Sequence, residues 1–230
     1  RSGGEEHMVQ QHRMNVSRRR VVLSVFYSLP LVACSKTGSG REGDDQATIQ
    51  QVGSSDSPVL GAPDVIAAPI KSTGQLVQPI TGIGINIPTD TSVLMPEKLG
   101  DGRTSVTYVW PADNAWGYLT LEGPKSFPVG NDAEATRKAV DAERERLITA
   151  LITPSEARSL TWPGFSQCSQ VTWTQTTVPP GWSEQTQVDA LALFLVDRSG
   201  RTYTAVAYAS REQLVPSSSA LSTLCSVTAL

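Results

Sequence analysis

The chain has 230 residues, of which 39% are hydrophobic and 18% charged, with a formal net charge of −3 at neutral pH. This length and composition suit one globular domain with additional segments. Counted from residue 34, where the mature chain is expected to begin, 14 Lys and Arg face 20 Asp and Glu, a net charge of −6. Because nucleic-acid binding needs a basic face, this acidity argues against a nucleic-acid partner.

The N-terminal region predicts an export signal. Residues 1–13 show no apolar periodicity, and we interpret them as upstream translation or a fragment end, with Met14 as the better start. Three arginines at positions 18–20 precede an apolar run from Val21 to Ala33, which is shorter than the ~20 residues a membrane-spanning helix needs. Residues 14–33 are therefore a predicted signal peptide. The arginines fit a twin-arginine signal as well as an ordinary secretory signal, so the export route stays open.

The apolar run ends in a short motif around a cysteine. Leu31-Val32-Ala33-Cys34 resembles the lipobox of bacterial lipoproteins. The resemblance implies cleavage before Cys34 and a diacylglyceryl group on its thiol. Two acyl chains anchor a protein stably without any transmembrane helix. The expected location is the extracytoplasmic face of the cell membrane, and the membrane itself is the first expected partner.

Residues 34–78 are expected to form a lipidated N-terminus followed by a disordered tether. This segment is rich in Gly, Ser, Pro and charged residues, with isolated apolar positions such as Val65 and Ile66, and such a composition does not bury a core. About 44 flexible residues would reach roughly 35–40 Å, enough to lift a domain past the lipid headgroups. Alternatively, Leu76 to Ile80 already belong to the first strand.

The globular domain is expected to cover residues 79–230. Apolar alternation that stops at prolines or turns predicts strands at 83–88, 104–110, 116–122, 170–178, 186–196 and 201–210. The last two flank Asp197-Arg198-Ser199-Gly200, a strong hairpin turn. Both carry apolar residues on both faces, which predicts that they lie mid-sheet with a cover on each side.

Two helices are predicted around these strands. Residues 131–152 form the long one, with Asn131 as N-cap and Glu134 completing a capping box. Its apolar stripe consists of Val140, Leu147, Ile148, Leu151 and Ile152. Residues 217–230 follow helical spacing behind Ser217 and carry Cys225.

This order of elements predicts an α+β fold, an antiparallel β-sheet covered by a long central helix and a C-terminal helix. The order, together with the opening Gly84-Ile85-Asn86-Ile87-Pro88, resembles the PsbP-like α/β sandwich, including the LpqN-type lipoproteins of actinobacteria. The resemblance covers about residues 79–230. It implies an accessory or binding module, and it assigns no binding residue by position.

The cysteines are consistent with export. With Cys34 expected to carry the lipid, Cys168 and Cys225 remain in an oxidising compartment, where a disulfide between them is predicted. Such a bridge would contribute roughly 4 kcal/mol in the chain-entropy model. The alternative is two separate buried thiols.

The sequence predicts no enzyme, no cofactor and no metal site. From residue 34 onward the chain has no histidine, which removes Ser-His-Asp and Cys-His machinery and leaves too few ligands for zinc. Carboxylate catalysis stays open and requires two carboxyl groups within ~5–10 Å. Asp189 is the most unusual candidate, interpreted as a strand-entry residue facing water or a helix N-terminus, while Asp113 and Glu122 are interpreted as turn and strand-end residues.

The tryptophans suggest a binding surface. Trp110 and Trp173 are expected in the core, whereas Trp162 and Trp182 lie in Gly- and Pro-containing loops and Trp116 begins a strand. We expect Trp116, Trp162 and Trp182 to rim one concave site for an envelope protein, a wall polymer or a lipid-like ligand.

The leading functional hypothesis is a non-enzymatic, lipid-anchored binding or accessory module of the cell envelope. One alternative is a carrier of a small apolar ligand between sheet and helix, which predicts an internal cavity of several hundred Å³. Another is a carboxylate-based cell-wall hydrolase.

Overall fold

The structure is a computed structural model that describes residues 61–71, 74–88, 91–110, 116–128 and 130–230. All of these residues belong to one structural unit, Ser55–Leu230. The predicted signal peptide, the lipobox with Cys34 and the first part of the predicted tether lie outside the described residues, as does Asp113.

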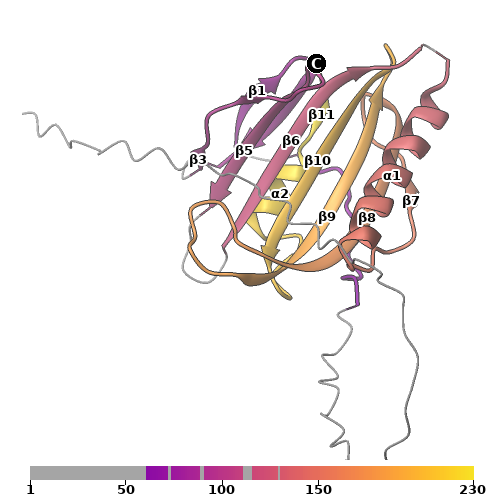
Figure 1. Cartoon of the computed structure of the whole chain (residues 1–230). Coiled ribbons are helices and arrows are strands. Elements are labelled where there is room, and N and C mark those ends of the chain that lie inside the picture. Colours follow the sequence, from indigo (N-terminus) through magenta and orange to yellow (C-terminus); the bar gives the residue numbers. More distant parts are fainter. Residues whose placement is uncertain (1–60, 72–73, 89–90, 111–115, 129) are drawn as a thin grey trace, which may run out of the picture. The chain divides into compact units, whose positions relative to one another are not determined.

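An eight-stranded antiparallel sheet forms the centre of the domain (Figure 1). Its order is β3, β5, β6, β10, β9, β8 and β7, with β4 also pairing with β5. In chain order these strands are β3 (Ser92–Val93), β4 (Glu97–Lys98), β5 (Thr104–Trp110), β6 (Gly117–Ser126), β7 (Arg158–Leu160), β8 (Phe165–Thr177), β9 (Thr186–Asp197) and β10 (Arg201–Ser210). The strands predicted at 104–110, 116–122, 170–178, 186–196 and 201–210 are confirmed.

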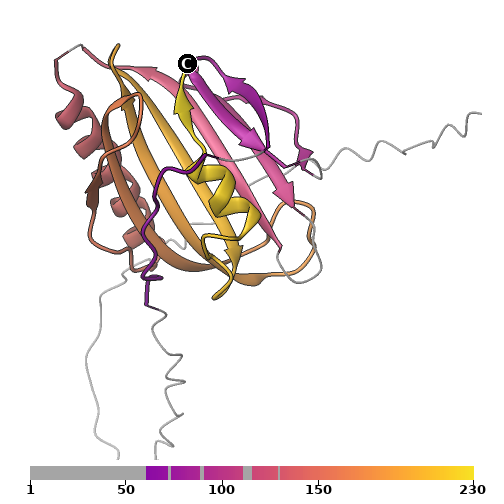
Figure 2. The same ribbon diagram turned by 180° about the vertical axis from the view of Figure 1, so that it is seen from behind.

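A second layer covers one face of this sheet (Figure 2). It consists of a three-stranded antiparallel sheet, β1 (Gln75–Ile80), β2 (Ile83–Ile87) and β11 (Thr228–Ala229), and the short helix α2 (Ser219–Cys225). The side chains buried between the layers are mainly aliphatic and include Ile83, Ile85, Leu119, Leu121, Leu191, Leu193, Leu195, Leu221 and Leu224. Burying one such side chain contributes about 1.5–3 kcal/mol, so this interior is the main source of stability.

The helix α1 (Asp132–Thr149) lies on the other face, over β8 and β9. Val140 and Leu147 are buried there among Trp173 and Phe194. The predicted apolar stripe is only partly correct, since Ile148 is 59% exposed and Leu151 95% exposed. Ile148 lies in the last turn of the helix and Leu151 follows its end, whereas Ile152 packs against the buried cluster.

The N-terminal end of α1 differs from the predicted capping box. Asn131 occupies the N-cap position, but its side chain accepts no hydrogen bond from the first turn. Glu134 instead pairs with Lys138, at 2.7 Å between Oε1 and Nζ. At α2 the cap is Ser218, one residue after the predicted Ser217, and its hydroxyl accepts from the Leu221 amide.

The predicted α+β fold class is wrong. Of the described residues, 45% lie in strands and 16% in helices, and the expected sandwich with a helix-covered sheet is not what forms. The reason lies in the second layer, where the C-terminal segment supplies only seven helical residues in α2. Strands β1, β2 and β11 provide most of the cover, and α1 covers only part of the opposite face.

The domain also begins before the expected boundary at residue 79. Residues 61–71, which we name the N-terminal strap, lie against β8 and were expected to be part of the disordered tether. Alternate side chains of β8 hold the strap backbone: Gln170 accepts from the Ala67 amide at 2.8 Å and donates to the Val65 carbonyl at 2.6 Å. Thr172 donates to the Pro63 carbonyl at 2.9 Å, and the Thr174 hydroxyl lies 3.2 Å from the Gly61 carbonyl. Residues 75–80 form β1, as the alternative interpretation anticipated.

The predicted Cys168–Cys225 disulfide is also wrong, because both cysteines are free, buried thiols. Helix α2, which carries Cys225, packs on β6 and β10, whereas Cys168 lies on β8, two strands from β10. Strands are ~4.8 Å apart, and a disulfide needs Cα atoms within ~7 Å. Burial raises the pKa of Cys168 to about 12 and also raises the pKa of Cys225, so both thiols stay protonated and poorly reactive.

The turn between β9 and β10 is organised by one buried carboxylate. Asp197 accepts hydrogen bonds from the Ser199 hydroxyl and amide and from the Arg201 amide and guanidinium, the last at 2.7 Å. Burial by itself would raise the pKa of Asp197, but these hydrogen bonds outweigh it and hold the pKa below its ordinary value. The ionised carboxylate therefore stabilises the hairpin.

Replacing Gln170 tests whether the strap is part of the folded domain. Gln170→Ala leaves the Ala67 amide and the Val65 carbonyl without their partner, so we expect a loss of about 2–3 kcal/mol in the free energy of unfolding. Urea denaturation measures the loss, and limited proteolysis should detect earlier cleavage near residue 65. Gln167→Ala, at an exposed position of the same strand, should change stability by no more than about 0.5 kcal/mol. Equal effects of the two variants would contradict the assignment.

Replacing Asp197 tests the turn through its pH dependence. A carboxyl group whose pKa is depressed by folding stabilises the fold above its unfolded pKa, and this contribution is lost as the pH falls through the folded pKa. Asp197→Asn should therefore reduce stability by about 1–3 kcal/mol near neutral pH, and the difference from wild type should shrink below about pH 4. Urea titrations across this range check both expectations, with Asp141→Asn on the exposed face of α1 as the control. A difference that does not depend on pH would count against the ionised carboxylate.

Candidate functional site

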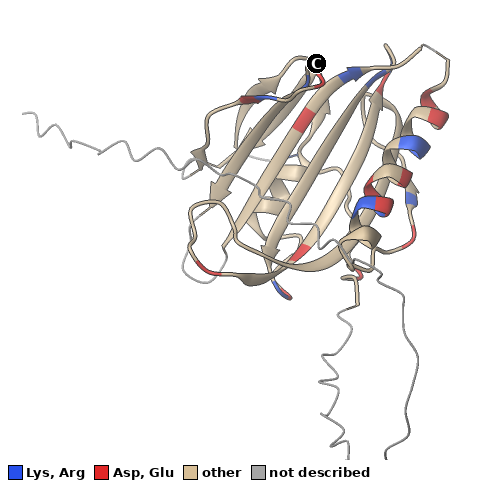
Figure 3. Cartoon of the chain, viewed as in Figure 1, with Lys and Arg blue, Asp and Glu red and all other residues tan. Residues whose placement is uncertain are grey.

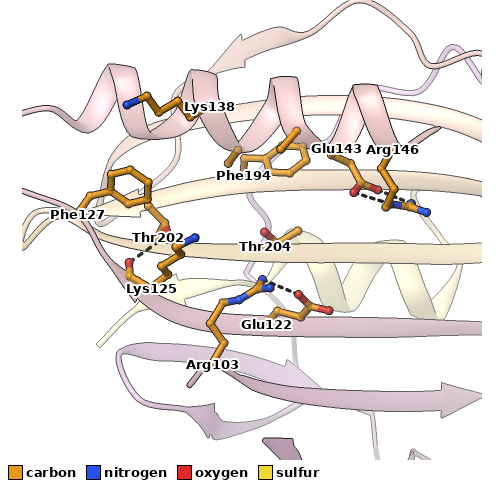
Figure 4. Close-up of a pocket in the computed structure, with 12 residues that line it drawn as sticks. Arg103, Glu122, Lys125, Phe127, Lys138, Glu143, Arg146, Phe194, Thr202 and Thr204 are labelled. Carbon is orange, nitrogen blue, oxygen red and sulfur yellow. Dashed lines mark hydrogen bonds and ion pairs between the residues drawn. The ribbon is translucent and has the colours of Figure 1, made fainter. Parts of the chain in front are cut away.

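A groove of about 600 Å³ lies between α1 and the part of the sheet that α1 leaves uncovered (Figure 4). One wall consists of α1 side chains, among them Lys138, Ala142, Glu143 and Arg146. The opposite wall comes from the ends of β5 and β6 and the residues beside them, with Arg103, Glu122, Lys125 and Phe127. Phe194, Thr202 and Thr204 form the floor. The groove is therefore lined by both charged and uncharged side chains.

Strand alternation places these residues on one face. Residues two apart on a strand point to the same side, so Glu122 on β6 and Thr204 on β10 face α1 while their neighbours Leu121 and Ala205 face the buried layer. The pairing register sets Glu122 opposite Thr204, and Thr204 opposite Phe194. One row across three neighbouring strands thus builds the centre of the groove.

Ion pairs hold most of the charged walls in place. Arg103 binds Asp101 and Glu122, each at 2.7 Å between nitrogen and oxygen, and the Arg103 guanidinium holds the pKa of Asp101 below its usual value. On the opposite wall Arg146 binds Glu143 at 2.6 Å. The charged residues are concentrated on α1 and at strand ends, whereas the middle of the large sheet is mostly uncharged (Figure 3).

Lys125 differs from the other basic residues of the groove. Within the described part of the chain it has no carboxylate partner, and its Nζ lies 6.0 Å from the centroid of the Phe127 ring. Figure 4 shows its ammonium group turned toward the groove, while that of Lys138 points along the helix. Lys138 is paired with Glu134.

An aromatic cluster continues the same sheet face beyond the groove. Tyr118 on β6 stacks on Tyr208 on β10, with ring centroids 4.2 Å apart and planes at 9°. Trp116 packs beside Tyr118 at 5.3 Å. Burial, with smaller contributions from Tyr118 and Glu143, raises the pKa of Tyr208, so this tyrosine is neutral at physiological pH.

The predicted tryptophan rim is only partly assembled. Trp116 and Trp182 come together, with ring centroids 5.0 Å apart, but Trp116 is buried and only Trp182, at 45% exposure, reaches the surface. Trp162 lies on the opposite side of the sheet, in the interior between the two layers, where its Nε1 donates to the Val227 carbonyl at 2.9 Å. Trp110 and Trp173 are buried core residues, as predicted.

The candidate carboxylates take structural roles. Asp189 is buried, where its carboxylate accepts from the Thr174 hydroxyl and the Glu212 amide, each at 2.7 Å; the expectation of a residue facing water or a helix N-terminus is wrong. Glu122 lines the groove as the partner of Arg103. The groove was not predicted from the sequence. Arg103, Lys125 and Arg146 are brought together by the strand register and by the position of α1, and neither can be derived from a local sequence pattern.

Among the described residues, no group of three or more His, Cys, Asp or Glu side chains is arranged to hold a metal ion. Neither helix of the described segments is long and apolar enough to cross a membrane. Comparison with protein-family models and with curated proteins gives no match.

Proposed function

We propose that this protein is a non-enzymatic binding module of the bacterial cell envelope, anchored to the outer face of the membrane through a lipid on Cys34, and that the groove beside α1 is its binding site. The observation that carries the binding role is the groove itself. Its volume of about 600 Å³ lies within the range of ~300–1,000 Å³ typical of ligand sites. The anchoring role is supported by the lipobox-like Leu31-Val32-Ala33-Cys34 motif.

The architecture of the groove supports recognition of a ligand from outside the chain. The ion pairs Arg103–Glu122 and Arg146–Glu143 fix long side chains on both walls before any ligand arrives. A site that is already ordered loses less conformational entropy when a ligand binds. The strap and the second layer lie on the other face of the sheet, so among the described residues neither of them covers the groove.

The two alternative functions fit this groove less well. A glycoside hydrolase of the common type needs two carboxyl groups that face the substrate, whereas the carboxylates of Glu122 and Glu143 are occupied by Arg103 and Arg146. A carrier would hold an apolar ligand in a cavity with only a few polar groups, whereas four basic and two acidic side chains line this groove. A binding module requires neither feature.

Blocking the groove tests the binding role. Ala142 is exposed on the groove wall, and Ala133 lies on the opposite face of α1, because residues nine positions apart differ by roughly 180° around a helix. The full-length protein bearing Ala142→Trp should lose at least about tenfold in affinity for its envelope ligand, because the indole fills the site, whereas Ala133→Trp should bind like wild type. Saturation binding to isolated envelope fractions measures this. Equal binding by both variants would overturn the assignment of the groove.

The membrane anchor requires a separate test. Cells expressing the full-length protein should incorporate radioactive palmitate into it and retain it in the membrane fraction. Cys34→Ser should abolish the label and release the protein, because no other attachment is proposed. Unlabelled wild-type protein, or a variant that still sediments with membranes, would contradict lipid anchoring without bearing on the groove.

A further inference from the structure

Basic side chains outnumber acidic ones among the residues that line the groove, four against two, although the chain as a whole has a formal net charge of −3. Both lining carboxylates, Glu122 and Glu143, are ion-paired with arginines of the same groove. Arg103 and Lys138 also pair with Asp101 and Glu134 just outside the lining. The attraction of the groove for an anionic occupant therefore depends on Lys125.

The position of Lys125 points to where the anionic group would bind. Its ammonium group is turned toward the groove and makes no ion pair in the described segments; it acts on the Asp101 carboxylate only through the field of its charge. It can therefore form a charge-assisted hydrogen bond with a ligand. Phe127 lies beside it, 6.0 Å from Nζ to the ring centroid. A ligand placed here would find a cation and an aromatic ring together.

The floor of the groove argues against an extended peptide. Peptides that bind along sheets usually pair with an exposed strand edge, but β6, β10 and β9 are interior strands with a neighbour on each side. Their backbone groups are already used within the sheet. Recognition must then come from side chains that project from the face.

Several side chains that project from this sheet face, in and beside the groove, carry hydroxyl groups. Thr204 lies on the floor, and the register places Ser105 opposite Glu122, and Thr107 opposite Thr120, on the same face of β5 and β6. The hydroxyls of Thr107 and Thr120 lie 3.4 Å apart. Hydroxyl groups both donate and accept hydrogen bonds, which matches the hydroxyl-rich edges of sugars, and a bound helix would instead need apolar anchors.

We infer that the groove binds an acidic oligosaccharide, with a sugar carboxylate at Lys125, a sugar ring beside Phe127 and sugar hydroxyls on Thr204. This inference rests on the proposed function, because it names the ligand class of the same groove. Lys125 supplies the charge recognition, and the threonine-bearing sheet face supplies hydrogen bonds that do not depend on charge.

Titration of the full-length protein with defined oligomers tests the inference. Tetragalacturonate should bind saturably by calorimetry, its neutral methyl ester should bind at least about fivefold more weakly, and higher salt should weaken the acidic ligand. Lys125→Gln, at an exposed position, should lose about fivefold or more in affinity. Lys138→Gln is the matched control and should lose less than about twofold, because its ammonium group is paired with Glu134. Thr204→Val should weaken the acidic and the neutral oligomer equally.

Four results would overturn the inference. These are no binding of tetragalacturonate, equal affinity for the methyl ester, tighter binding of tetraglutamate than of tetragalacturonate, and equal effects of the two lysine substitutions. Its failure is distinguishable from failure of the proposed function. If Ala142→Trp blocks binding of the envelope ligand while no acidic sugar binds, the groove remains the site and only the ligand class is wrong.

Discussion

The burial of the β9–β10 hairpin on both faces is the constraint on which the rest of the domain depends. Leu191, Leu193 and Leu195 point to one side of the sheet, and Ala190, Ala192 and Phe194 point to the other. Exposing either set would forfeit much of the hydrophobic stabilisation. Other elements of the chain must therefore cover these two strands on both faces. The second layer with the strap covers one face, and α1 covers part of the other.

The two covers differ in extent, and the difference creates the groove. On one face β1, β2, β11, α2 and the strap together bury the leucine side. On the other face a single helix, α1, covers β8 and β9 but leaves the α1-facing sides of β6 and β10 partly open. Charged and polar side chains lie at that boundary together with Phe127 and Phe194. The groove thus arises where the second cover ends.

In the proposed binding role, the charge arrangement would give this surface its selectivity. Arginines on both walls are occupied by carboxylates, which fixes their positions and reduces their attraction for an anion, whereas Lys125 keeps its charge available. A ligand would therefore meet one available cation, the Lys125 ammonium group, in a defined position and not a diffuse basic patch. Such a site suits discrimination by the position of an acidic group, and a lipid anchor would keep it close to envelope polymers at high local concentration.

The sequence determined much of the strand content of the domain and little of its assembly. The alternation of apolar residues located β5, β6, β8, β9 and β10, and Asp197 to Gly200 identified the hairpin turn, because strand period and turn chemistry are local properties. The helix predicted at 131–152 exists as residues 132–149. The lipobox-like motif at Cys34 is likewise a property of the sequence alone.

The tertiary structure determined the features that depend on contacts between distant residues: the strap, the state of the cysteines, the fold class and the groove. Residues 61–71 form a strap and not a tether because their backbone binds Gln170, which lies about a hundred positions further along the chain. Cys168 and Cys225 stay apart because α2 packs on β6 and β10 and not on β8. The fold class was mistaken because short strands can cover a sheet as well as a helix, and their pairing partners are distant. The groove residues Arg103, Lys125 and Arg146 come from three separate segments, so only the pairing register and the placement of α1 could bring them together.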